Sequence, residues 1–125
     1  MKRRAAREKA FQLLFQLDMN EEQPKKALDE FLATKEHDIF LKTLVEGVLT
    51  YREELDEKIA AHLENWSFNR VANTEKTILR VAAFEMIHLD DIPTAVSINE
   101  AIELANKYGD EKSGKFINGI LSKIN

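Results

Sequence analysis

The segment Gly109-Asp110-Glu111-Lys112-Ser113-Gly114-Lys115-Phe116 matches the GxxxxGK spacing of a phosphate-binding loop. In such a loop a Ser or Thr follows the lysine and ligates Mg²⁺, whereas Phe116 follows it here. The segment also comes after a helical pattern rather than a strand, and the acidic Asp110 and Glu111 would repel phosphate. We therefore interpret its glycines as a junction between two helices and not as a nucleotide site.

Other arrangements of reactive side chains are equally poor candidates for catalysis. The three histidines, His37, His62 and His88, are scattered without the spacing of a zinc site. The chain has no cysteine, which excludes disulfides, thiol nucleophiles and Cys-based zinc sites. Its serines lack a nucleophile-elbow context. We predict a protein that is not an enzyme, with no catalytic residue, no metal site and no cofactor.

The first ten residues are strongly basic. Lys2, Arg3, Arg4, Arg7 and Lys9 oppose a single acidic residue, although the net charge of the chain is −4. Local field rather than total charge attracts phosphates, and arginine can fork onto phosphates or stack on bases. Cations at a helix start also oppose the macrodipole unless an anion binds there. The pattern indicates a nucleic-acid site, with a solvated helix start as the alternative that charge alone leaves open.

A second basic site is indicated near the start of the last helix. Lys112 and Lys115 flank Phe116, and a basic pair beside an aromatic ring suits a base that stacks on the ring. The alternative is that Phe116 belongs to a buried stripe with Ile120 and Ile124. The residues alone leave both interpretations open.

The elements that position these residues are predicted from helical periodicity. Apolar residues recur at helical spacing over 10–17, over 27–32 after Pro24 in a first turn, and over 41–63. Residues 41–63 could form one long helix or two that break near Gly47 or Tyr51, and we favour one.

The remaining segments are also predicted to be helical. Residues 64–73 form a connection anchored by Trp66 and Phe68, and 74–87 form a helix. Ser97-Ile98-Asn99-Glu100 has the pattern of a capping box, which predicts a helix start. That helix runs to Tyr108, with Gly109 as a left-handed residue after its end, and a last helix carries 116–124. No alternating strand pattern is present, so we predict an all-α fold.

Length and composition set the protein class. A chain of 125 residues with 44% hydrophobic content is predicted to be one globular domain, residues 1–125. No segment approaches the roughly 20 apolar residues of a membrane span, and no apolar run follows the basic N-terminus. We expect a cytoplasmic protein.

Several segments along the chain carry a resemblance to a known family. Val96-Ser97-Ile98-Asn99-Glu100-Ala101-Ile102-Glu103-Leu104-Ala105 and Lys115-Phe116-Ile117-Asn118-Gly119-Ile120-Leu121 closely resemble the C-terminal signature of NusB proteins. Arg3-Arg4-Ala5-Ala6-Arg7-Glu8-Lys9-Ala10-Phe11-Gln12 is similar to the first helix of that family. Glu75-Lys76-Thr77-Ile78-Leu79-Arg80, with Phe84-Glu85, is similar to its central helix. The similarity spans the chain and keeps the family order.

The resemblance implies an all-α fold of about seven helices in two small packed bundles. It implies a transcription antitermination factor that binds boxA RNA of ribosomal RNA transcripts together with the ribosomal protein NusE. The pair would join NusA, NusG and RNA polymerase to suppress Rho-dependent termination and support ribosome biogenesis.

The resemblance also implies roles for individual residues. It assigns RNA contacts to Lys2, Arg3, Arg4, Arg7, Lys115 and Phe116. It assigns partner contacts to Phe15 and Glu75. His62 matches an RNA-contacting aromatic position only if a gap is introduced, and Lys112 departs from an acidic residue found there in some relatives.

Two other functions remain as alternatives. The domain also resembles the N-terminal part of certain ribosomal RNA cytosine methyltransferases, whose catalytic domain uses reactive cysteines that this chain lacks. A helical scaffold that binds only proteins is the second alternative, and a salt titration of RNA binding separates it from the RNA adaptor.

Overall fold

The computed structural model describes residues 1–19, 38–64 and 67–124, and these form helices without any strand. In chain order the elements are α1 (Arg3–Met19), α3 (Ile39–Thr50), α4 (Arg52–Ala60), the short 3-10 helix η1 (Phe68–Arg70), α5 (Asn73–His88), α6 (Thr94–Tyr108) and α7 (Ser113–Leu121). The all-α prediction is confirmed. The helix predicted over 27–32 and the predicted anchor Trp66 lie outside the described residues.

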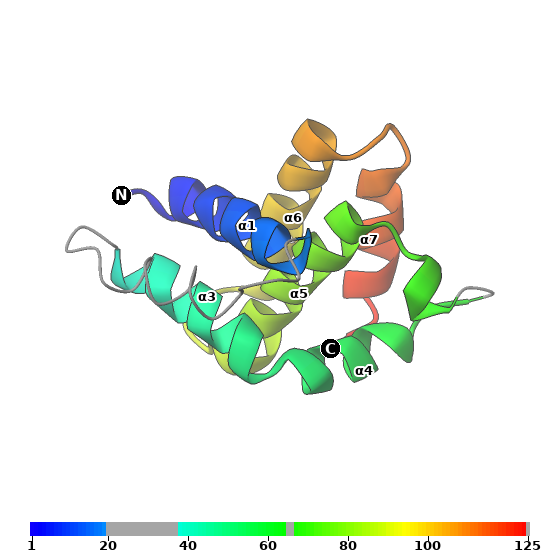
Figure 1. Cartoon of the computed structure of the whole chain (residues 1–125), viewed down its shortest axis with the longest axis horizontal. Helices are drawn as coiled ribbons and strands as arrows, with labels where there is room; N and C mark the ends of the chain where they lie inside the picture. The colour runs from blue at the N-terminus through cyan, green and yellow to red at the C-terminus, as the bar shows by residue number, and fades with distance from the viewer. Residues whose placement is uncertain (20–37, 65–66, 125) are drawn as a thin grey trace.

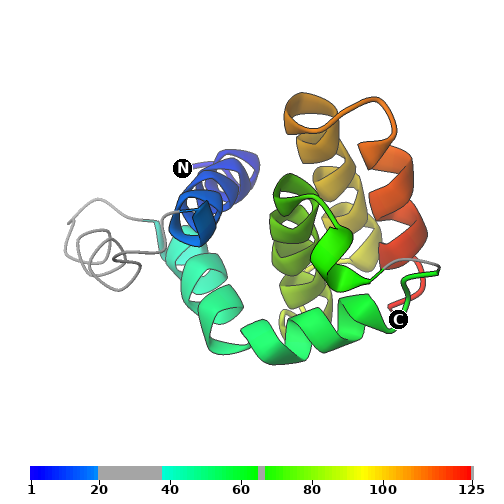
Figure 2. The ribbon, with the colours of Figure 1, turned by 45° about the vertical axis from the view of Figure 1, so that its right-hand side comes forward.

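The helices pack as two groups that share α5. On one side α1 packs along α3, and on the other α6 packs against both α5 and α7 (Figures 1 and 2). α5 contacts α1, α3, α4, α6 and α7, so it joins the two groups. The six α-helices of the described residues agree with the predicted number of about seven.

The core is made by apolar side chains from all six α-helices. Ala10, Leu14 and Leu17 of the first predicted stripe are buried, and α5 carries buried apolar residues on most of its circumference. A helix that is buried on most of its circumference belongs in the centre of a fold, which is where α5 lies (Figure 2). None of the helices in the described ranges is both long and apolar enough to cross a membrane.

The prediction of one long helix over 41–63 is wrong. α3 ends at Thr50 and α4 begins at Arg52, because Tyr51 leaves the helical conformation with φ −103° and ψ 16°. The Tyr51 ring stacks on the ring of His88 at a centroid distance of 4.0 Å. The break redirects the chain, so that α4 packs against α5 instead of continuing along the line of α3 (Figure 1).

The predicted capping box at Ser97 is also wrong. α6 begins at Thr94, directly after Pro93, so Ser97 already lies inside the helix. The Ser97 side chain is buried, and its Oγ donates a hydrogen bond to Glu85 Oε1 at 3.0 Å. A hydroxyl that satisfies a buried carboxylate stabilises more than one that caps an exposed helix end, since unpaired buried charge is costly.

Gly109 ends α6, but not in the predicted left-handed conformation. Its φ of −97° and ψ of −167° are extended. Glycine is needed there for space, because a Cβ would lie 2.5 Å from Ser113 Oγ. Asp110 Oδ1 accepts hydrogen bonds from the Lys112 backbone N–H and from Ser113 Oγ, which closes the turn into α7. The last helix therefore begins at Ser113, three residues earlier than Phe116.

Candidate nucleic-acid interface

The first turn of α1 and the residue before it present three cations to solvent. Lys2, Arg3 and Arg4 are exposed, and side chains of Arg3 and Arg4 retain 54% and 69% of their accessible surface. Arg3 lies 3.5 Å from Asp91, and Arg4 Nε donates to Glu100 Oε2 at 3.1 Å. The hydrogen bond with Glu100 raises the pKa of Arg4 above its ordinary value. Such exposed ion pairs are weak, so a phosphate can displace the carboxylates at little cost.

Arg7 does not lie on this surface. Its side chain is 4% exposed, and its guanidinium faces the carboxylate of Glu85, which is 1% exposed. Arg7 Nη2 donates to Glu85 Oε1 at 2.8 Å, and Nε donates to Oε2 at 2.9 Å. The prediction that Arg7 contacts phosphate conflicts with this burial, because Nε and Nη2 of its guanidinium already donate to the Glu85 carboxylate. The structure instead gives Arg7 the task of tying α1 to α5.

Lys115 of α7 and Lys123 after its end lie beside an aromatic ring in a hollow of about 230 Å³. Phe116 is half-buried, with part of its ring against the core, and Lys115 is exposed. The opposite wall is formed by the segment after α4, namely His62, Leu63 and Glu64. The two interpretations of Phe116 are therefore compatible, since one part of the ring packs while another faces the hollow. Lys112 is exposed but does not line it.

The structure brings His62 to Phe116 but keeps the two basic sites apart. His62 lines the same hollow as Lys115 and Phe116, although it lies more than 50 residues away in sequence. The N-terminal cations lie on the far side of the molecule from α7, with α5 and α6 between (Figures 1 and 2). The hollow beside Arg4 is lined by cations as well as carboxylates, among them Arg7, Lys107, Glu100 and Glu103.

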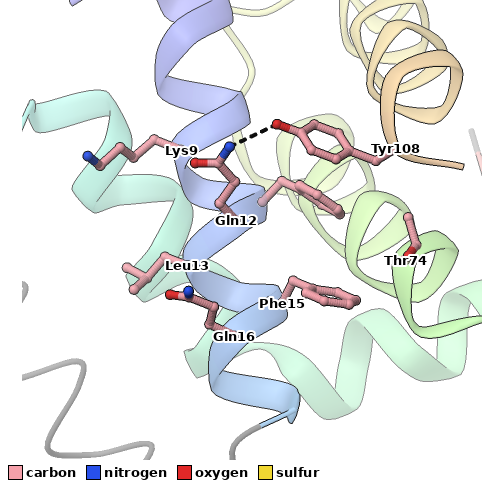
Figure 3. Close-up of a pocket in the computed structure, with 8 residues that line it drawn as sticks. Lys9, Gln12, Leu13, Phe15, Gln16, Thr74 and Tyr108 are labelled. Atoms are coloured by element: carbon pink, nitrogen blue, oxygen red, sulfur yellow. Dashed lines mark hydrogen bonds between the residues drawn. The ribbon is translucent and has the colours of Figure 1, made fainter.

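A larger hollow, of about 630 Å³, lies where α1, α5 and α6 meet. Phe15 of α1, Thr74 of α5 and Tyr108 of α6 surround the same space (Figure 3). Gln12 Nε2 donates to the Tyr108 hydroxyl at 2.8 Å. Glu75 follows Thr74 in the first turn of α5 and is half-buried, but it does not line the hollow. The two predicted partner residues thus lie near one concave, partly aromatic surface.

Sequence reasoning missed two contributors to this surface. Phe11 stacks on Phe15, with ring centroids 5.9 Å apart, and lies 4.8 Å from the ring of Tyr108. The four-residue spacing of Phe11 and Phe15 puts them on one helix face and could have indicated a shared site. Nothing local could have added Tyr108, which is almost 100 residues away. Glu8 Oε1 holds the Tyr108 side chain by accepting a hydrogen bond from its hydroxyl at 2.6 Å. The hydrogen bond from Lys107, and after it the one from Tyr108, lowers the pKa of Glu8.

The chain is similar to a large set of known proteins over nearly its whole length. Residues 4–125 match the model of the NusB family. The transcription antitermination protein NusB of Oceanobacillus iheyensis is 55% identical over 99% of this chain and 98% of its own length. That of Bacillus subtilis is 51% identical over 99% of this chain and 95% of its own.

Solved structures agree with these relatives. T. maritima NusB superposes with a TM-score of 0.87 and 36% identity, covering 99% of this chain and 90% of that one. A structure of the antitermination factors NusB and NusE in complex with dsRNA matches with a TM-score of 0.82 and 34% identity. It covers 98% of this chain and 94% of the matched chain.

Proposed function

The chain belongs to the NusB family, and on this premise we propose that it is a non-catalytic transcription antitermination factor that binds RNA. The observation that carries the proposal is the hollow beside α7, where the half-buried ring of Phe116 lies among Lys115, His62 and Lys123. A ring flanked by cations offers stacking to a base and charge to the adjoining phosphates. The exposed Lys2, Arg3 and Arg4 add a second cationic surface.

We further propose the ribosomal protein NusE as the protein partner. A matched structure contains NusB, NusE and RNA together. The hollow around Phe15 suits a protein partner, because aromatic side chains in a concave surface are typical anchors of interfaces. Phe15 and the adjoining Glu75 would contact NusE, while RNA occupies the cationic surfaces. If RNA and NusE strengthen each other's binding, thermodynamic linkage requires the factor to be the same in both directions.

Membership of the family supports a more specific proposal for the RNA, the protein partners and the effect on transcription. The RNA would be boxA of ribosomal RNA transcripts, and the complex with NusE would join NusA, NusG and RNA polymerase in the cytoplasm. Its effect would be suppression of Rho-dependent termination during ribosomal RNA synthesis. Phosphate contacts position an RNA while base contacts specify it. We therefore expect the protein alone to prefer single-stranded RNA, whose bases are free to stack.

Replacing Lys2, Arg3 and Arg4 together by Gln is expected to weaken binding of a single-stranded boxA RNA and to change its salt dependence. Each phosphate contact on a single strand contributes about 0.7 to the slope of log K against log salt, so the slope should fall by about two. Fluorescence anisotropy between low and high salt measures it.

Lys58→Gln together with Arg70→Gln serves as the control, since both cations are exposed and lie on α4 and η1, outside the proposed surfaces. If the triple variant keeps the wild-type slope, the N-terminal cations do not bind phosphate. If the wild-type protein shows no salt-dependent RNA binding at all, the chain is a scaffold for proteins only and the proposed function is wrong.

Phe15→Ala is expected to weaken the complex with NusE by about tenfold or more, the size of effect typical of an aromatic anchor. The charge reversal Glu75→Lys should act in the same direction. RNA binding by the protein alone should change little in either variant, because neither residue lines the hollow beside α7. Calorimetric titration of NusE measures the effect, with a thermal melt to check the fold. Undiminished NusE binding in both variants would exclude this surface as the partner site.

A further inference from the structure

The four glycines of the chain differ in what surrounds them. At three of them an added Cβ would lie 3.1 Å or closer to a neighbouring residue, so packing explains the glycine. The pairs are Gly47 with Phe84, Gly109 with Ser113 and Gly114 with Asn106. At Gly119 an added Cβ would meet no atom of the described residues within 4 Å.

Gly119 is nevertheless in a position where glycine weakens the protein. It lies inside α7, and glycine in a helix interior is destabilising relative to alanine. It is exposed, and the contacts of the described residues give no packing reason for it. A further physical use of glycine is to let another molecule approach the backbone closely.

The surroundings of Gly119 indicate what that molecule is. Lys115 and Gly119 are four residues apart in α7, which puts them on one helix face, and Lys123 follows in the turn after the C-cap Ser122. Lys115, Gly119 and Lys123 all line the hollow that contains Phe116. Lys123 Nζ lies 3.1 Å from Glu64 Oε1, an exposed pair that an incoming phosphate can replace.

We propose that Gly119 is the point at which one nucleotide of single-stranded RNA comes closest to the α7 backbone. The base lies against the ring of Phe116, and the phosphates on either side of it are held by Lys115 and Lys123. The proposal rests on the proposed RNA-binding function and adds two contacts to it, the bare backbone at Gly119 and the cation of Lys123. A side chain at position 119 would occupy the space that the nucleotide needs.

The test separates binding from folding, because the two respond in opposite directions. Gly119→Ala and Gly119→Leu both improve helix propensity, and they should raise the melting temperature by about 2–4 °C. Gly119→Leu should weaken binding of a single-stranded boxA RNA by about tenfold, the effect of losing one stacked base, with Gly119→Ala in between. Lys123→Gln should weaken it less and lower the salt slope by about 0.7.

Asn118→Ala is the matched control, since Asn118 is the neighbouring exposed residue of α7 and does not line the hollow. It should leave RNA affinity unchanged. If Gly119→Leu binds RNA as tightly as this control, Gly119 is not a contact point, while the proposed function stands. A Gly119→Leu protein that melts below the wild type would refute the open space on which the inference depends. Absence of RNA binding by the wild type would overturn both proposals.

Discussion

Arg7→Ala is expected to lower the free energy of unfolding by about 3–5 kcal/mol, because it leaves the carboxylate of Glu85 buried without its partner. Glu85 accepts three hydrogen bonds from Arg7 and one from Ser97, and its side chain is 1% exposed. No water can replace those donors without opening the contact between α1 and α5. Chemical denaturation of the purified variant measures the loss.

Two further variants distinguish a buried ion pair from a surface contact with RNA. Arg7→Lys keeps the charge but lacks the planar fork, so it should recover only part of the stability. Replacing Arg7 by Met and Glu85 by Leu together removes both charges, and such replacements of buried pairs are often neutral or stabilising. If Arg7 were instead a phosphate contact, Arg7→Ala would weaken RNA binding with no loss of stability.

Gly47→Ala is expected to lower the free energy of unfolding by about 1–3 kcal/mol, the usual range for an overpacked core. An added Cβ would lie 2.1 Å from the tip of the Phe84 ring, and Phe84 is 4% exposed. The ring cannot simply turn away, because it also lies 5.4 Å from the ring of His88 and 6.3 Å from that of Tyr51. The clash should exceed the gain in helix propensity from removing a glycine.

Phe84→Leu provides the compensating change for this second prediction. A smaller side chain at position 84 removes the aromatic tip that the new methyl group meets. We expect the double variant to be more stable than Gly47→Ala alone, and a double-mutant cycle from denaturation curves gives the coupling. If Gly47→Ala proves more stable than the wild type, then α3 does not approach α5 as closely as the structure shows.

The helices themselves could be predicted because their signal is local. The apolar residues at positions 10, 14 and 17 recur at the period of a helix, and a helix can bury such a stripe wherever its partner lies. The same holds for the last helix, whose Ile117, Ile120 and Leu121 are buried. The basic character of the first turn was also readable, because charge is a property of residue type.

Other features depended on contacts between residues far apart in the chain. Arg3, Arg4 and Arg7 look alike in sequence, yet Glu85, 78 positions from Arg7, decides that only Arg7 is buried. Ser97 has the pattern of a helix cap and serves the same carboxylate instead. The break at Tyr51 accompanies stacking on His88, to which no local pattern points.

The sequence by itself therefore determined the helical class, the family and the types of side chain available for binding RNA. Only the tertiary structure decided which of those side chains reach solvent, which meet in one hollow and which hold the helices together. The physical reason is that helical periodicity arises from bonds within a few residues, whereas burial of a charge is favourable only if its partner lies opposite it. Phe116 and His62 show this dependence on tertiary structure, since the hollow they share exists only where the segment after α4 comes against α7.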